Sequence, residues 1–69
     1  MLLKVTAIGN QNNVSTIYFD KPTPALVNIY KIWTIMGGKK GTEIKDESGK
    51  NTLIVQETPE EINEMLSNM

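Results

Sequence analysis

The chain has 69 residues, a formal net charge of −1, seven lysines, and no arginine, cysteine or histidine. Disulfides and thiolate metal sites are therefore excluded, the commonest zinc ligand is missing, and sequence-specific DNA readout, for which arginine is the preferred side chain, is disfavoured. No apolar run approaches the ~20 residues of a membrane span, so we expect a cytoplasmic protein, or one inside a virion if it is phage-encoded. A chain this short buries only about 60% of its unfolded surface, so we expect a single domain, residues 1–69, that protein partners help to stabilise.

The first segment, residues 1–19, is predicted to be an N-terminal β-hairpin. Residues 3–8 alternate partly between apolar and other side chains, which is typical of a strand. Residues 9–13 are glycine, asparagine and glutamine and favour a turn, because glycine and asparagine tolerate left-handed backbone. Residues 14–19 are rich in β-branched and aromatic side chains, which indicates a second strand.

A loop is predicted over residues 20–26, which contain Pro22 and Pro24. Each proline lacks a backbone N–H and fixes its own φ, so a central strand does not tolerate it. This loop connects the hairpin to the rest of the chain and is too short to separate two domains.

Residues 27–36 begin a predicted meander over residues 27–56, and they fit two patterns. In the pattern that we favour, Asn28 caps a single helical turn and a strand follows over residues 32–36, since asparagine favours caps and β-branched and aromatic residues favour strands. In the other pattern, one helix spans residues 25–36.

The rest of the meander has a glycine- and lysine-rich hairpin loop at residues 37–41, a short strand at 42–45 and a turn at 47–50. Its last strand covers residues 51–56. Here Leu53 and Val55 alternate with Ile54, so we expect Ile54 on the face opposite the core.

A C-terminal helix is predicted over residues 58–68. Thr58, Pro59 and Glu61 match a capping box with proline at the first helical position. The apolar residues that follow are spaced i, i+3, i+4 and i+7, which predicts one stripe packed on the sheet. The stripe consists of Ile62, Met65, Leu66 and Met69.

Together these elements predict an α+β fold: a small, bent antiparallel sheet of about five strands, resembling a partly open SH3-like barrel, with one C-terminal helix. The predicted core consists of Leu3, Val5, Val14, Ile17, Phe19, Ile32, Ile35, Ile44, Leu53, Val55, Ile62, Met65 and Leu66.

Catalysis finds no support in the sequence. Glu43, Asp46 and Glu47 lie in or beside a turn, where carboxylates are usually solvated, and the serines have no histidine to activate them. The Gly-Gly-Lys-Lys stretch lacks the Walker spacing and precedes a strand. We therefore expect no enzyme, no cofactor and no metal.

A binding surface is better supported. Aromatic residues are interleaved with lysines, a combination that protein-binding surfaces and single-strand nucleic-acid platforms both use, although Trp33 and Phe19 favour core positions in so small a domain. The candidate interaction surface consists of Tyr18, Tyr30, Lys31, Trp33, Lys39, Lys40 and Ile54.

A family resemblance covers residues 27–66. The motifs that carry it are Val27-Asn28 followed by Ile32 and Ile35, Gly49 in a turn, Val55-Gln56-Glu57, and Thr58-Pro59-Glu60-Glu61-Ile62. This layout resembles small bacterial flagellar proteins of the FlbD/SwrD type, and short proteins of phages and mobile elements have a similar layout. The resemblance implies a role in supporting flagellar motor assembly or power, with no catalytic residues.

The expected function is that of a small non-enzymatic interaction or structural module. We expect it to act through sheet edges and faces, within a homo-oligomer or a larger assembly such as a phage particle. The alternatives are a single-stranded nucleic-acid-binding module that uses the aromatic and lysine residues, which the net charge disfavours, and a flagellar accessory protein.

Overall fold

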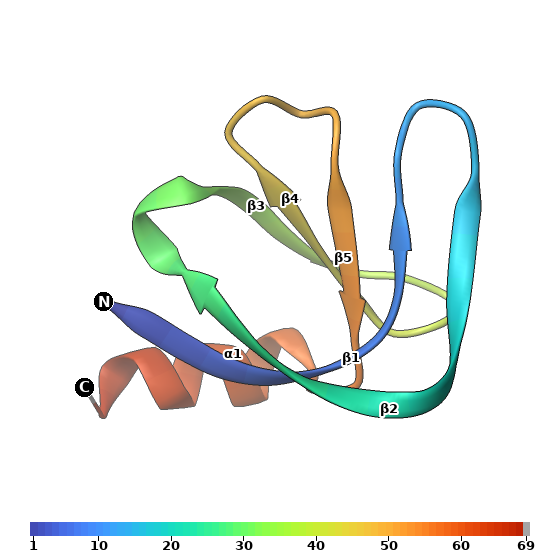
Figure 1. Cartoon of the computed structure of the whole chain (residues 1–69). Helices are drawn as coiled ribbons and strands as arrows, with labels where there is room; N and C mark the ends of the chain where they lie inside the picture. Colours follow the sequence, from blue (N-terminus) through green and yellow to red (C-terminus); the bar gives the residue numbers. More distant parts are fainter. Residues whose placement is uncertain (69) are drawn as a thin grey trace.

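The computed structural model describes residues 1–68, which form an open five-stranded antiparallel sheet and one α-helix (Figure 1). The strand order is β2–β1–β5–β4–β3. The elements are β1 (Leu2–Gln11), β2 (Thr16–Asn28), the 3₁₀ turn η1 (Ile29–Lys31), β3 (Ile32–Gly37), β4 (Thr42–Asp46), β5 (Thr52–Val55) and α1 (Pro59–Ser67). The predicted small α+β fold is confirmed.

The long hairpin of β1 and β2 bends sharply in its middle (Figure 1). The β1–β2 register runs regularly from Leu2 to Ala7 and shifts before Gly9, where β2 has several more residues than β1. Such an irregularity turns a strand and increases its twist. Gly9 lies at this corner because a side chain there would begin 2.7 Å from the carbonyl oxygen of Ile17.

The loop predicted over residues 20–26 is wrong, because β2 continues through both prolines and Pro24 lies opposite Thr6 in the ladder. The physical reason is the place of β2 in the sheet. β2 is an edge strand, and the side of an edge strand that faces no neighbour needs no N–H donors, so it accommodates proline.

The short 3₁₀ turn η1 connects the two edge strands, β2 and β3. The Asn28 side chain accepts a hydrogen bond from the Tyr30 N–H at 3.0 Å and caps the turn. β3 then begins at Ile32. The capped turn followed by a strand is confirmed, and the alternative of one helix over residues 25–36 is wrong.

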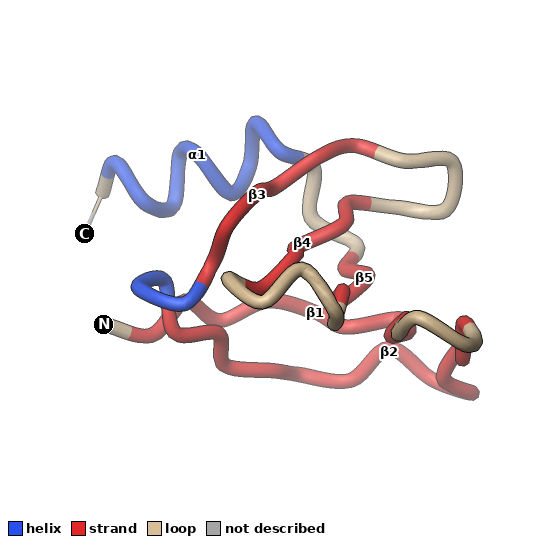
Figure 2. Tube along the Cα trace, turned by 90° about the horizontal axis from the view of Figure 1, so that it is seen from above, coloured by secondary structure: helices blue, strands red, loops and turns tan. Residues whose placement is uncertain are grey.

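The C-terminal helix has the predicted capping box. The Thr58 hydroxyl accepts from the Glu61 N–H at 3.1 Å, and the Glu61 carboxylate accepts from the Thr58 N–H at 3.1 Å. In Figure 2 α1 runs beside β3. Ile62 is fully buried, while Met65 and Leu66 pack partly buried against the same core. Met69, the last member of the predicted stripe, lies outside the described residues.

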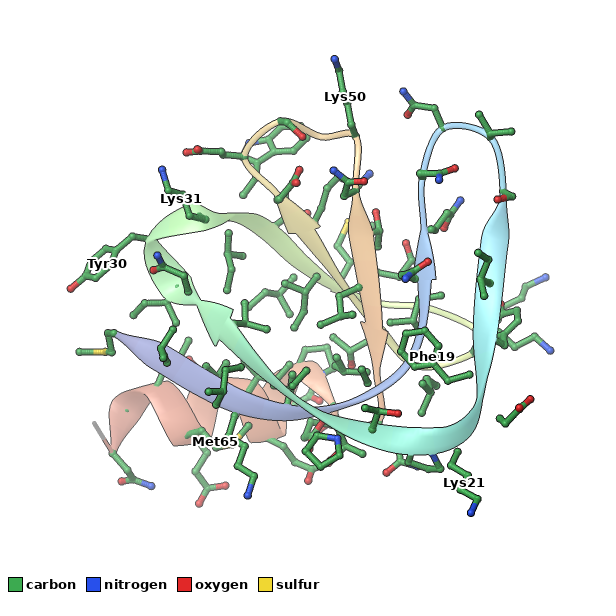
Figure 3. The ribbon with its side chains drawn as sticks, viewed as in Figure 1. Phe19, Lys21, Tyr30, Lys31, Lys50 and Met65 are labelled. Carbon is green, nitrogen blue, oxygen red and sulfur yellow. The ribbon has the colours of Figure 1, made fainter. Side chains whose placement is uncertain are left out.

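The core lies between the curved sheet and α1. Most of the predicted members are buried or packed against the buried cluster, and Phe19 is half-buried and turns inward from β2 in Figure 3. The predicted core positions of Val14 and Ile17 are wrong, since these side chains are 92% and 55% exposed. Both belong to the part of the hairpin beyond the corner, which extends past the core.

The prediction for Ile54 is wrong in the opposite direction. The side chain was expected on an exposed face and is only 4% exposed. β5 lies in the middle of the sheet, and the loop between β3 and β4 approaches its outer face at Gly41. A side chain on Gly41 would begin 3.5 Å from Ile54 and 2.5 Å from the carbonyl oxygen of Val55. Glycine there lets the loop cover Ile54.

Candidate interaction surfaces

The predicted interaction surface is divided between two places in the fold, and Ile54 belongs to neither. Tyr18, on β2, lies under Lys40 of the β3–β4 loop, with the lysine nitrogen 5.9 Å from the ring centre. Lys39 is exposed in the same loop. The other predicted residues lie on η1 and β3, where Tyr30 and Lys31 point outward (Figure 3).

The second place contains three exposed apolar side chains, Tyr30, Trp33 and Met36, which we call the β3 surface. Trp33 is 65% exposed, which decides between the core and the surface position that the sequence left open. The β3–β4 register shifts between Ile32 and Thr34, and Trp33 is the extra residue in this bulge. A bulge changes the direction in which a strand side chain points, which explains why an aromatic residue in a strand misses the core.

The indole of Trp33 lies beside the β4–β5 turn. Its carbon atoms are 3.8–4.0 Å from the point where a side chain on Gly49 would begin. Gly49 has φ +72°, a conformation that favours glycine in a turn. The turn therefore supports one face of the indole and leaves most of the ring in solvent.

Hydrogen bonds and an ion pair fix this turn. The Ser48 hydroxyl donates to the Asp46 carboxylate at 2.6 Å. This bond, together with those from Asn51 and the Gly49 N–H, lowers the pKa of the Asp46 carboxyl, and the opposing effect of desolvation is smaller. Lys31 forms an ion pair with Glu47 at 3.2 Å, and the Glu47 N–H donates to the Lys31 carbonyl at 2.9 Å. The β3 surface therefore lies beside an acidic turn in which Glu47 balances the charge of Lys31.

A cleft of about 480 Å³ opens over the concave face of the sheet. Its lining combines apolar side chains and the charged Lys31 and Asp46 with five side-chain amides, those of Asn10, Gln11, Asn12, Asn28 and Asn51. The volume falls in the range of small-molecule sites, about 300–1,000 Å³. Three of the amides already bond within their own turns, because Asn12 and Asn28 accept from backbone N–H groups and Asn51 donates to Asp46. These three amides thus have a structural role, and nothing in the sequence pattern had indicated this cleft.

A polar contact that the sequence did not indicate connects β1 to the segment before α1. The carboxylate of Glu57 accepts from the N–H and the hydroxyl of Thr6, both at 2.9 Å, and the Thr42 hydroxyl donates to the Glu57 carbonyl. Burial opposes ionisation of Glu57, but the donated hydrogen bonds outweigh it and the pKa of the carboxyl is lowered. A general acid needs a raised pKa, so we assign Glu57 a structural role.

Chemistry based on a metal ion has no support in the described part of the chain. Among residues 1–68 no group of three acidic, histidine or cysteine side chains is placed to hold an ion. Within the same residues, no helix is long and apolar enough to cross a membrane.

Comparison with known proteins adds no family to these observations. No protein-family model, curated protein or solved structure matches the chain. The resemblance to small flagellar proteins therefore stays a prediction.

Proposed function

We propose that the protein is a non-enzymatic interaction module that binds another polypeptide along β3. One observation carries the proposal: Trp33 is 65% exposed in the bulge of an edge strand, between exposed Tyr30 and Met36. Exposed tryptophan and tyrosine residues are the side chains that most often dominate binding energy when a partner covers them.

The strand itself provides a second element of recognition. β3 pairs only with β4 among the described strands, so its other edge has backbone groups without a ladder partner, and α1 runs beside this strand (Figure 2). An extended segment of a partner can add to such an edge, with main-chain hydrogen bonds giving affinity and side-chain contacts giving specificity. Trp33 and Met36 are then available to contact that segment.

The charges around this surface favour a protein over a nucleic acid. Lys31 is paired with Glu47, Asp46 is ionised, and residues 57–68 contain four glutamates and no lysine. A phosphate backbone gains most from unpaired cations. The exposed Tyr18 beside Lys40 favours the second candidate, a single-strand nucleic-acid-binding module, because base stacking on an aromatic ring next to a cation is its usual mode.

The setting follows from the same proposal. A module of this kind works within a homo-oligomer or a larger assembly, in the cytoplasm or within a virion if the chain is phage-encoded. The flagellar accessory role implied by the resemblance is the alternative setting, and a source genome without flagellar genes would remove it.

Photo-crosslinking tests the proposal. A benzophenone amino acid placed at Met36 should give one dominant protein adduct in cells of the source, and the Trp33→Ala change should abolish that adduct. The same probe at Asn63, an exposed position on α1, is the matched control and should give no such band. An adduct at Met36 that is indifferent to Trp33→Ala would refute the role of this surface.

An oligonucleotide titration separates the second candidate. The chain has a single tryptophan, so quenching of its fluorescence by single-stranded DNA or RNA reports on the β3 surface. The fluorescence anisotropy of a labelled oligonucleotide reports also on binding at Tyr18 and Lys40. We expect no quenching that salt reverses. Salt-sensitive quenching together with a missing protein adduct would replace the proposed function with nucleic-acid binding.

A further inference from the structure

The outer part of the β1–β2 hairpin has an unusual composition. We call residues 9–19 the far arm. None of these eleven residues is charged, although 22% of the chain is. The far arm contains Val14, the most exposed of the large apolar side chains at 92%, as well as exposed Ile17 and Tyr18.

The edge of the sheet formed by β2 divides into two halves of different character. The near half, residues 20–28, contains Asp20, Lys21, Pro22 and Pro24. Charged residues and prolines of this kind prevent the unpaired edge of a sheet from pairing with another strand. The far half, residues 16–19, has Thr, Ile, Tyr and Phe, and none of these protecting residues.

The far arm is also held in a defined conformation. At its tip, the Asn12 side chain accepts from the N–H groups of Val14 and Ser15 at 2.8 and 2.9 Å, and the Asn12 N–H donates to the Ser15 carbonyl at 3.0 Å. At its base, Gly9 allows the close approach to Ile17. A preorganised edge loses little conformational entropy on binding.

The sequence of this edge matches a second copy of itself. In an antiparallel pairing centred on Ile17, Thr16 of each copy lies opposite Tyr18 of the other and Ile17 lies opposite Ile17, so the paired strand residues are uncharged. The strand residues of this edge are uncharged, with Lys40 the cation beside Tyr18. A second copy provides the same short apolar strand by two-fold symmetry.

We infer that the protein forms a two-fold symmetric dimer in which residues 16–18 of two copies pair antiparallel, edge to edge, around Ile17. This inference deepens the proposed function, because it assigns self-association to β2 and leaves the β3 surface for a different protein. The contact is short, so the dimer is weak, with a Kd on the order of 10 μM to 1 mM.

Sedimentation equilibrium over this concentration range tests the inference. The unmodified chain should pass from monomer to dimer. Ile17→Lys places two like charges across the two-fold axis and should weaken the dimer at least about tenfold. The matched control is Leu26→Lys, which adds the same charge at an exposed leucine in the near half of β2 and should leave the dimer unchanged.

A cysteine scan gives a geometric test, since the chain has no native cysteine. Ile17→Cys should form a disulfide-linked dimer under mild oxidation, because the two copies meet at this residue, whereas Lys21→Cys should not. Circular dichroism confirms that each variant is folded, which is expected at these exposed positions. A chain that stays monomeric at about 1 mM, or a dimer that persists in Ile17→Lys, would overturn the inference.

The outcome is separable from that of the proposed function. Trp33→Ala should abolish the crosslinked adduct at Met36 and leave the dimer unchanged, while Ile17→Lys should do the reverse. Loss of the dimer in Trp33→Ala would show that the copies meet at β3 and would overturn the assignment to β2.

Discussion

The change Ile62→Ala tests whether α1 is part of the core. Ile62 is 1% exposed and packs in one buried cluster with Leu3, Val5 and Val55. Truncating a fully buried isoleucine costs about 2–5 kcal/mol, the lost transfer energy plus the cavity left behind. Domains have about 0.05–0.15 kcal/mol of stability per residue, which for 69 residues is roughly 3–10 kcal/mol. One side chain of the helix thus accounts for about half of the free energy of unfolding.

Urea unfolding followed by far-UV circular dichroism measures this loss. With a slope of about 1 kcal/mol per molar urea for a small domain, the midpoint should fall by about 2 M or more. The control is Asn63→Ala, the exposed neighbour on α1, which should change the stability by less than about 0.5 kcal/mol. A loss below about 0.5 kcal/mol for Ile62→Ala would mean that α1 does not pack on the sheet in solution.

Two further changes test the β1 contacts. The Glu57 carboxylate, whose pKa is lowered by the donors at Thr6, stabilises the fold fully above the ordinary glutamate pKa of about 4.3, and this contribution is lost as the pH falls through the lower folded-state value. Glu57→Gln should therefore lower the free energy of unfolding by about 1–2 kcal/mol at neutral pH and weaken the pH dependence of Tm below the glutamate pKa. A Tm that falls as steeply with acid as in the unmodified chain would contradict the structural role of Glu57. Gly9→Ala places a methyl group 2.7 Å from the Ile17 carbonyl oxygen and should cost about 1–3 kcal/mol, with amide chemical-shift changes concentrated in residues 9–19; stability equal to the unmodified chain would show that the corner is less tight.

The features that the sequence predicted correctly depend on local contacts. The capping box at Thr58 and the Asn28 cap each satisfy backbone donors within three residues, so their spacing alone specifies them. The meander likewise follows from short turns between strand-forming residues. Local chemistry was sufficient for the type and order of these elements.

The features that the sequence did not predict depend on the position of each strand in the sheet. Pro22 and Pro24 are compatible with a strand only because β2 lies at the edge. Ile54 is buried only because a loop covers the outer face of the central strand β5. Strand order and loop placement are long-range properties that alternation of residue types does not encode.

The candidate site was predicted only in part, because part of it depends on local sequence and part on irregularities of the strands. Tyr30 and Trp33 are both exposed, and they belong to consecutive elements, η1 and β3. The exposure of Trp33 results from a one-residue bulge, and that of Val14 and Ile17 from the corner at Gly9. Neither irregularity has a signal in residue composition strong enough to place it beforehand.

The interior position of β1, between β2 and β5, has a consequence for synthesis of the protein. β1 needs β5 as its second neighbour, and the Thr6–Glu57 contact joins residues 51 positions apart. On a ribosome that adds about 5–20 residues per second, β1 waits several seconds for this neighbour to be made and released. The sheet therefore closes only after translation of residues 52–57, and until then the nascent chain presents an open strand that a chaperone or another nascent copy is able to bind.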